Sequence, residues 1–265
     1  MPSFYAHYRF GSTVLASLPK PLYSVCTENR ALFDIGLYGP DIFFFYRPFT
    51  PNRISRTGQE SHGMTGTYFF ERFAAAFEVT KEKDALLSYF CGFLCHLALD
   101  SVCHPEVYRA QQYTGQTHAA IETSFDRTLL LEDHLDPIRY EPCTHLRITR
   151  KNAEIVARIF STISAKGVEK SLRSTVFCSR LLFLKNIHLR KLLRFLLRYA
   201  AGSESIYEMI MLPNPDPRCE ASDKALSACC KEAETVALEL LSEIPIYIES
   251  GKLVSDAFSR TFKGR

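Results

Sequence analysis

The chain has 265 residues, 46% of them hydrophobic and 23% charged, and its formal net charge is +3. This length and apolar content are enough for a sizeable core in one large domain, so they exclude an intrinsically disordered chain. The small net charge gives no global argument for binding nucleic acid or an acidic membrane, and partners must be sought in local patterns.

The N-terminus and the cysteines indicate an intracellular protein. Residues 1–18 show neither an unbroken apolar core nor a small-residue cleavage pattern, so they do not resemble a signal peptide. The longest charge-free apolar run, Ala85–Leu99, is too short to span a bilayer. Nine cysteines without framework spacing fit reduced thiols, and Cys91, Cys95 and Cys103 are expected to be core residues. We expect a soluble, cytoplasmic protein.

The first fifty residues predict short helices separated by turns. Residues 1–25 suggest a short helix ended by prolines, with His7 near its start. Ala31–Tyr38 has helical spacing, and a Gly-Pro turn then delivers Asp41 to the edge of a run of large apolar residues. Considered alone, His7 favours a surface or capping position, and Asp41 favours a cap of the following turn.

A loop is predicted for Pro48–Gly66, because this segment is rich in Pro, Gly, Ser, Thr and Arg. It carries His62 near its far end, and loops commonly supply functional groups to a rigid scaffold. Helices are predicted next for Thr67–Phe77, Lys81–Cys103 and His118–Leu131.

Ionisable side chains recur every four residues in the second of these helices. His96, Asp100 and His104 follow one another at this step, and four residues turn through about 400°, so the three side chains stack on one stripe. The surrounding positions are apolar, and burying an unpaired aspartate is strongly unfavourable. Metal coordination is a standard way to hold such a group inside a core.

His118 and Glu122 repeat the same step on the next helix. A random chain of this composition would contain His-x3-acid-x3-His roughly 0.03 times, but His-x3-acid alone roughly once. The triple is therefore informative, whereas the pair gains weight only from its position fourteen residues after His104. A short connection would bring that pair back to the first helix.

Helix geometry limits how many groups one ion can bind. His96 and His104 lie about 12 Å apart along a helix axis, whereas zinc–ligand bonds are about 2 Å long. Two or more ions are therefore implied. Pro105 is expected to end the helix near His104, letting the chain turn and return His118 and Glu122.

The other ionisable residues nearby are not predicted to bind a metal ion. Asp126 is expected to orient a ligating imidazole or to pair with Arg127 or a neighbouring cation. His134 and His145 lie in a polar segment punctuated by prolines and match no ligand spacing, so they are expected at the surface.

The second half of the chain predicts further helices. Residues 149–166 and Ser222–Glu243 are amphipathic, the latter capped by Ser222 or Asp223. Residues 173–198 hold seven Lys/Arg and no Asp/Glu among many apolar residues, which predicts a basic amphipathic helix. Such a helix either lies on an anionic membrane or packs with a solvated basic face.

The chain lacks two-residue alternation and Asn-Gly or Asp-Gly hairpin signals, so we expect a mostly or wholly α-helical fold. We divide it into a metal-site half, residues 1–131, and further helices of the same domain, residues 132–265.

Five segments together resemble the zinc-dependent phospholipase C family, an all-α fold related to the secreted single-strand-specific zinc nucleases. They are FYAHYRFG around His7, GLYGPDIFFFY around Asp41, His62 itself, GFLCHLALDSVCHP and HAAIETSFD. The resemblance covers roughly residues 2–131, with eight ligand-type residues in the family's order. It implies a single large helical domain of the phospholipase C and zinc nuclease type.

The resemblance also implies the metal ligands, with up to three Zn²⁺ per chain. One zinc would be held by Asp41, His62, His96 and Asp100, a second by His104, His118 and Glu122, and a third by His7, a bridging Asp100 and the N-terminal amine. The family's mature N-terminus is a Trp exposed by secretory processing, and this chain has no Trp. Pro2 offers a substitute once Met1 is removed.

The implied function is a metal-dependent phosphodiester hydrolase, phospholipase C-like, in which a trinuclear zinc cluster activates water. Asp41 is the family's suggested general base, but a metal-bound carboxylate is a weak base, so we expect it to orient the nucleophilic water. The implied substrate is a phospholipid or another phosphodiester, reached at a peripheral membrane surface by the basic stretch 173–198. There is no strong nucleic-acid signal.

Two alternatives stay open at this point. A nucleotidase or nuclease would use the same cluster, with an aromatic stacking platform in Phe43–Phe49. A non-catalytic, metal-stabilised, membrane-associating scaffold would leave no open coordination position.

Overall fold

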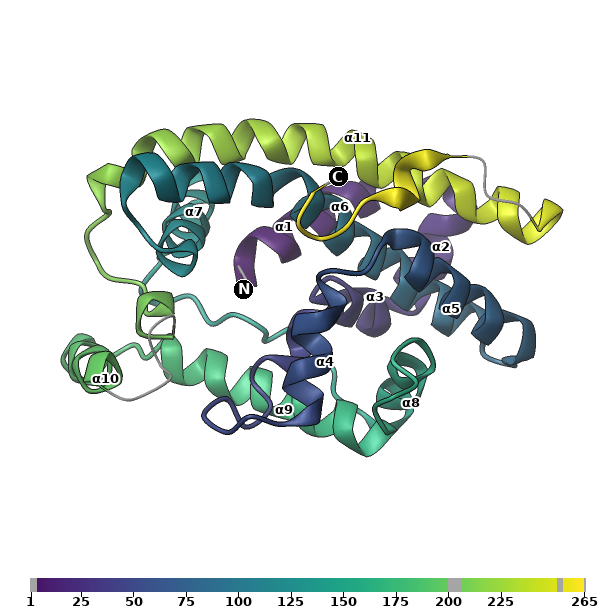
Figure 1. Cartoon of the computed structure of the whole chain (residues 1–265), viewed down its shortest axis with the longest axis horizontal. Helices are drawn as coiled ribbons and strands as arrows, with labels where there is room; N and C mark the ends of the chain where they lie inside the picture. Colours follow the sequence, from purple (N-terminus) through teal and green to yellow (C-terminus); the bar gives the residue numbers. More distant parts are fainter. Residues whose placement is uncertain (1–3, 200–205, 252–254, 265) are drawn as a thin grey trace.

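The computed structural model describes residues 4–199, 206–251 and 255–264, which form eleven α-helices joined by 3-10 helices and loops (Figure 1). No strand occurs in these ranges, and only isolated bridges join Thr65 to Thr261 and Thr261 to Gly264. The all-α prediction is confirmed. The α-helices are α1 (Phe4–Ala16), α2 (Lys20–Glu28), α3 (Arg30–Gly36), α4 (Arg53–Ser61), α5 (Gly66–Val79), α6 (Lys83–Thr114), α7 (His118–Glu132), α8 (Arg150–Ile159), α9 (Ala165–Leu182), α10 (Ile187–Tyr199) and α11 (Glu220–Ser250), and the 3-10 helices are η1 (Gly39–Phe43), η2 (Tyr207–Met209), η3 (Pro217–Cys219) and η4 (Asp256–Ser259).

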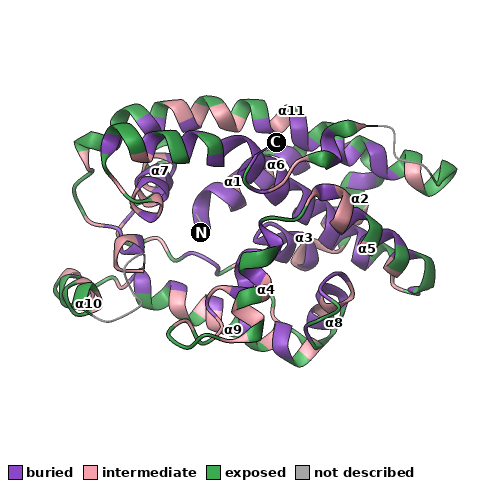
Figure 2. Ribbon diagram, viewed as in Figure 1, coloured by how far each residue is buried: buried purple, intermediate pink, exposed green. Residues whose placement is uncertain are grey.

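Helix α6 is the centre of the fold. Every residue from Ala85 to His104 is buried, and α6 packs against α11 and α3 most extensively and also against α1, α2, α5 and α7 (Figure 2). In the described residues it alone is long and apolar enough to cross a membrane, but that stretch is wholly buried inside the protein. Its apolar character on all sides is explained by the helices that surround it.

Pro105 does not end α6, so this prediction was wrong. The helix continues through Pro105 to Thr114 and ends at Gly115, whose φ of 65° lies in the left-handed region that favours glycine. A proline removes one backbone hydrogen bond, but α6 continues because it is packed against several other helices. The turn toward α7 therefore comes about ten residues later than expected.

Close contact between α3 and α6 depends on two glycines. A Cβ atom on Gly36 would lie 2.2 Å from the carbonyl oxygen of Tyr89, and one on Gly92 would lie 2.1 Å from that of Phe33. Neither distance is possible for a real side chain, so the two backbones can touch only because both residues are glycine. This contact places η1, which follows α3, directly beside the ionisable stripe of α6.

The segment Pro48–Gly66 is not the loop that its composition predicts. It contains α4, whose N-cap residue Asn52 accepts a hydrogen bond of 3.0 Å from the backbone N–H of Ser55. His62 is the C-cap residue of this helix. Because α4 packs against η1, His62 is held rigidly rather than on a flexible loop.

Three boundaries in the second half also differ from the predictions. The basic stretch 173–198 is divided between α9 and α10 by a break at residues 183–186, so it is not one helix. The helix predicted for 149–166 ends at Ile159. Helix α11 begins at Glu220, and Asp223 is a buried acceptor for Ser124 and Thr128 instead of a cap.

Candidate metal centre

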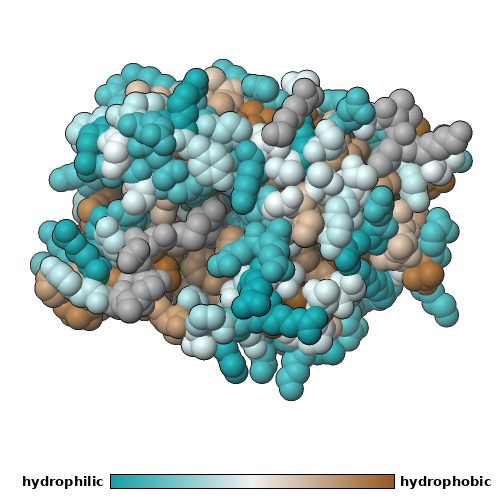
Figure 3. All heavy atoms as spheres, in the orientation of Figure 1, coloured by the Kyte–Doolittle hydropathy of each residue, from teal (hydrophilic) through white to brown (hydrophobic). Residues whose placement is uncertain are grey.

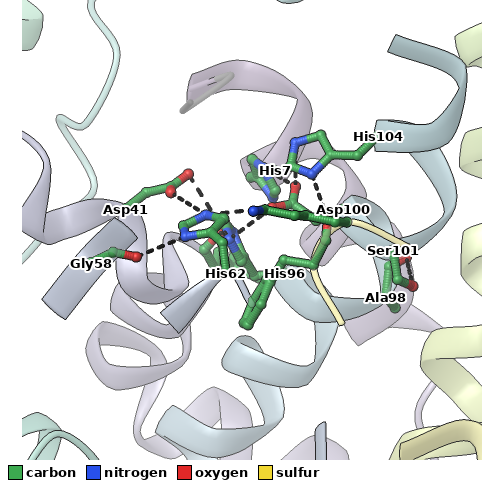
Figure 4. A network of polar contacts seen from close by, with 12 residues as sticks. His7, Asp41, Gly58, His62, His96, Ala98, Asp100, Ser101 and His104 are labelled. Atoms are coloured by element: carbon green, nitrogen blue, oxygen red, sulfur yellow. Dashed lines mark hydrogen bonds and ion pairs between the residues drawn. The ribbon is translucent and has the colours of Figure 1, made fainter. Parts of the chain in front are cut away.

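Eight ionisable side chains from separate parts of the chain meet around Asp100. Figure 4 shows six of them pointing toward one another. The first turn of α1, η1, the end of α4, the middle of α6 and the start of α7 contribute His7, Asp41, His62, His96, Asp100, His104, His118 and Glu122. All are buried except His118, whose side chain is 20% exposed. The structure therefore brings together every predicted ligand that lies in the described residues, whereas Pro2 lies outside them.

Asp100 is at the centre of the cluster and uses both carboxylate oxygens. Its Oδ1 lies 3.3 Å from Nε2 of His7 and 3.8 Å from Nε2 of His104. Its Oδ2 lies 3.3 Å from Nε2 of His96 and 4.0 Å from Nε2 of His62. One carboxylate therefore faces four imidazoles from three helices.

Two further acids extend the cluster in opposite directions. Oδ1 of Asp41 lies 3.0 Å from Nε2 of His62, and its Oδ2 lies 3.9 Å from Nε2 of His96. On the other side, Oε1 of Glu122 lies 3.0 Å from Nε2 of His118 and 3.5 Å from Nε2 of His104.

Three groups within this cluster have ligand atoms that all lie within 4.8 Å of one another. The groups are His7, His96 and Asp100; Asp41, His62 and His96; and His104, His118 and Glu122.

Backbone carbonyls fix the orientation of three imidazoles. Nδ1 of His62 lies 2.8 Å from the carbonyl of Gly58, and Nδ1 of His96 lies 3.0 Å from that of Leu37. Nδ1 of His104 lies 2.5 Å from the carbonyl of Phe262. A carbonyl oxygen only accepts, so each Nδ1 carries a proton and donates it, and the Nε2 of each ring is directed into the cluster.

The chemistry of these atoms fits bound zinc. Nε2 of His62, His96 and His104 and Oδ1 of Asp41 are buried and make no hydrogen bond. Buried polar atoms are almost always paired, and such a concentration of unpaired acceptors in one place calls for a cation. Imidazole nitrogen and carboxylate oxygen are the ligand types that zinc takes in proteins.

The electrostatics of the metal-free cluster favour ionised carboxylates. Burial raises the pKa of Asp100, but the His104 and His96 imidazoles outweigh burial and hold that pKa well below its usual range. The pKa of Glu122 is lowered in the same way, against burial, by His118 and His104. For His104, burial lowers the pKa, but Asp100 and Glu122 raise it above its ordinary value. Both carboxylates therefore stay ionised, which is the state in which a carboxylate binds a metal ion.

Asp126 is hydrogen-bonded to the backbone at the start of α1. Its carboxylate accepts hydrogen bonds of 3.0 Å and 2.8 Å from the backbone N–H groups of Tyr5 and Ala6. These N–H groups lie in the first turn of α1, where a helix leaves its donors unpaired. Asp126 thus anchors the start of α1 and, through the backbone, the position of His7.

The other histidines and the cysteines lie outside the cluster. His134 is exposed, as predicted, but His145 is half-buried and stacks on Tyr8 with ring centroids 4.1 Å apart, so its surface assignment was wrong. All nine cysteines are described and free. The predicted core positions of Cys91, Cys95 and Cys103 are confirmed.

The sequence did not reveal the groups that support the cluster. Phe262 is fully buried in a segment that we name the C-terminal strap (residues 255–264), and its ring packs against His62 and His96. A backbone carbonyl leaves no sequence signal. Gly39 was predicted to form the turn before Asp41, but its closeness to the cluster was not: its φ is +44°, and a Cβ there would lie 2.4 Å from the His96 ring.

Comparisons with known proteins agree with this geometry. A family model described as zinc-dependent phospholipase C matches residues 6–171, which is more than half of the chain and includes all eight clustered residues. Neither the curated proteins nor the solved structures yield a match.

Proposed function

The chain belongs to the zinc-dependent phospholipase C family, and from this membership we propose that it hydrolyses the phosphodiester bond of a phospholipid. In this reaction water attacks phosphorus and the bond from phosphorus to the glycerol oxygen breaks. Diacylglycerol leaves with a proton that comes from the attacking water, and the head group keeps the phosphate, which now carries the oxygen of the water. The observation that carries the proposal is the convergence of ligand-type side chains around Asp100, among which Oδ1 of Asp41 and the Nε2 atoms of three imidazoles are buried without a hydrogen bond.

We assign the zinc ligands from the three groups described above. Asp41, His62 and His96 form one group and His104, His118 and Glu122 form another. His7 and Asp100 belong to a third group, for which the imino nitrogen of Pro2 is the proposed additional ligand. When bound, zinc supplies positive charge that polarises a phosphoryl group and lowers the pKa of water.

The protein's own residues orient the reactants. Asp41 directs both oxygens toward imidazoles, and its pKa is lowered because His62 and His96 outweigh its burial. Asp41 therefore stays ionised and accepts a hydrogen bond from the attacking water, orienting that water rather than removing a proton from it.

Aromatic side chains border the cluster on two sides. Phe44 and Phe262 lie beside His62, with ring centroids 5.2 Å and 5.1 Å from the imidazole. Tyr108 lies beside His104, with ring centroids 5.9 Å apart, and is 40% exposed. We infer that substrate approaches past His118 and Tyr108, which are partly exposed, and not past Phe262, which is fully buried.

The test compares Asp100→Asn with His134→Asn. Asn has almost the shape of Asp but no charge, and we expect Asp100→Asn to lose about 1000-fold in the rate of phosphodiester hydrolysis, since a metal supplies several kcal/mol of charge stabilisation. His134 is exposed and has a φ of 58°, which Asn tolerates, so His134→Asn is a matched control that should keep full activity. A wild-type rate in Asp100→Asn, with the fold checked by circular dichroism, would contradict the proposal.

Metal content tests the assignment of the sites. Elemental analysis of protein whose N-terminus has been sequenced should find three zinc ions per chain when Pro2 is the first residue. A value of one or none would contradict the three-ion assignment.

A nucleotide substrate is the second candidate, favoured by the Phe44 ring beside His62, which is placed to stack on a base. Comparing hydrolysis of phosphatidylcholine with that of 3′-nucleotides separates the two substrates. The non-catalytic scaffold predicts zinc binding without hydrolysis of either. A cytoplasmic location is a further proposal, testable by cell fractionation.

A further inference from the structure

Helix α10 presents its apolar side to solvent. Five large apolar side chains cover its outward face, and each is more than half exposed: Leu189 51%, Leu192 52%, Phe195 58%, Leu196 56% and Tyr199 72%. The fully buried side chain of this helix is Arg190. This arrangement reverses the usual placement of apolar residues inside and charged residues outside.

Hydrogen bonds prevent α10 from rolling to bury these residues. The Arg190 guanidinium donates to three backbone carbonyls: Leu184 at 2.8 Å, Met211 at 2.7 Å and Ile138 at 2.8 Å. Arg194, one turn later on the same side, donates to the carbonyls of Tyr207 and Ile210. The polar side of α10 is thereby fixed against the protein, and its apolar side must face outward.

A basic pocket lies beside this apolar face. It has a volume of about 550 Å³ and lies between α7, α10, η2 and the segment leading into η3. Two acids, Glu208 and Asp216, also line it. Its five cationic side chains are Arg127, Lys191, Arg194, Arg198 and Arg218.

The positive charge of the pocket is only partly neutralised. Arg218 is paired with Asp216, but Lys191 and Arg198 are exposed at the edge of the apolar face. Nε of Arg127 is buried without a hydrogen-bond partner. Guanidinium groups bind phosphate oxygens well, so the pocket is suited to a phosphate group.

We propose that α10 docks the protein on an anionic membrane surface. The apolar face enters the boundary between head groups and acyl chains, and the basic pocket takes the phosphate of an anionic lipid head group. Figure 3 shows hydrophobic, brown surface at the end of the molecule where α10 lies. This inference rests on the proposed function, because docking through α10 would hold the protein at the surface that contains its phospholipid substrate.

Charge favours a membrane over a second copy of the chain. Residues 173–198 contain seven Lys/Arg and no Asp/Glu, so pairing two α10 faces would bring like charges together. An anionic lipid surface offers the opposite sign beside an apolar interior. Helix α7 also lines the basic pocket, so docking of the pocket on a head group would bring α7 near the lipid surface. This helix begins with the proposed ligand His118.

The experiment measures co-sedimentation of the zinc-loaded full chain with vesicles of phosphatidylcholine, alone or mixed with phosphatidylglycerol. We expect binding that requires phosphatidylglycerol and weakens with added salt. The double variant Leu192→Ser and Leu196→Ser should bind about tenfold more weakly, whereas Val79→Ser, which changes an 84% exposed residue on α5, should bind as wild type. Equal binding by the wild type and the double variant would overturn the proposal.

A second pair of variants tests the pocket. Lys191→Gln with Arg198→Gln should remove the preference for phosphatidylglycerol, and Lys224→Gln with Lys231→Gln on α11, the same loss of charge elsewhere, should not. Retained preference in the first pair would overturn the pocket assignment.

Two companion measurements separate the outcomes. Light scattering measures the oligomeric state. A dimeric wild type and a monomeric Leu192→Ser and Leu196→Ser variant, together with no vesicle binding in the co-sedimentation experiment, would overturn the membrane assignment in favour of self-association. Hydrolysis of a water-soluble phosphodiester reports the proposed function independently. A protein that binds vesicles through α10 but hydrolyses no phosphodiester would support the docking surface while contradicting the proposed function.

Discussion

Helices α6 and α10 both place residues against the usual rule, but in opposite senses. In α6, His96, Asp100 and His104 are buried in the centre of the protein, and in α10 large apolar side chains face solvent while Arg190 is buried. The difference lies in how the buried polar groups are paired. Arg190 donates to three carbonyls, whereas Nε2 of His96 and of His104 makes no hydrogen bond.

This contrast separates a structural polar group from a ligand. A buried group whose partners are all within the protein holds an element in place, and Arg190 does this for α10. Buried acceptors without hydrogen bonds indicate that a further species completes the site, as proposed for the α6 cluster. Each of the following experiments tests one side of this contrast.

Removal of zinc should have the largest effect and should affect only the α6 side. At a zinc concentration about 1000 times its dissociation constant, each bound ion stabilises the fold by about 4 kcal/mol, and a chelator removes that stabilisation. Hydrogen exchange should then show lost protection in α1, α6 and α7 and little change in α10. Equal loss of protection in α10 would contradict the conclusion that α10 is held by hydrogen bonds within the protein and not by zinc.

Arg190→Met should be the largest single change on the α10 side. It leaves three carbonyls without their donor, one of them buried and two partly buried, and we expect a loss of about 3 kcal/mol in the free energy of unfolding. Arg198→Met changes an exposed arginine of the same helix and should stay within about 0.5 kcal/mol. Urea unfolding measures both, and similar values for the two variants would show that Arg190 does not fix α10.

The pH dependence of the metal-free chain should reflect the α6 cluster. The pKa values of Asp100 and Glu122 are lower in the folded chain than in the unfolded chain. These two carboxylates therefore stabilise the fold above about pH 4, and this contribution is lost as the pH falls through their pKa values in the folded chain. The pKa of His104 is raised by folding, so its stabilisation is complete below about pH 6.5 and is lost as the pH rises through the folded value.

Thermal unfolding with chelator should therefore show greatest stability between about pH 4 and pH 6.5. Zinc must displace the His104 proton, so zinc affinity should rise about tenfold per pH unit below the His104 pKa. A zinc affinity independent of pH from 5 to 7 would contradict this assignment of protons.

Asp126→Ala should have the smallest effect of the four. It removes the acceptor for two N–H groups at the start of α1, which should cost about 1 kcal/mol. Because His7 directly follows Ala6 in the same turn, the same variant should also lower zinc content, whereas Glu249→Ala, which changes an exposed acid on α11, should alter neither. Unaltered stability and zinc content in Asp126→Ala would show that α1 is positioned by its apolar packing alone.

Side-chain chemistry and spacing were readable from the sequence, but backbone partners were not. The four-residue step of His96, Asp100 and His104 predicted the buried stripe, because helix periodicity fixes which side chains share a face. The carbonyls of Gly58, Leu37 and Phe262 that orient the imidazoles have no such pattern, since every residue carries a carbonyl.

The errors in secondary structure have one physical cause. Local propensity predicted a helix end at Pro105, but α6 continues to Thr114. It also predicted a loop at Pro48–Gly66, but this segment contains α4. In both places packing against neighbouring elements outweighs local preference, and packing partners cannot be read from a short window. The reversed α10 was missed similarly, since its Arg190 acceptors come from residues 138, 184 and 211.

The strap residue Phe262 affects when the centre can be assembled during synthesis. Its carbonyl orients His104, yet it is translated 144 residues after His118. At roughly 5–20 residues per second, that interval lasts on the order of ten seconds. A ribosome-bound chain that ends before Phe262 therefore carries its histidines without this support, and the Phe262 carbonyl can orient His104 only after residue 262 has been translated.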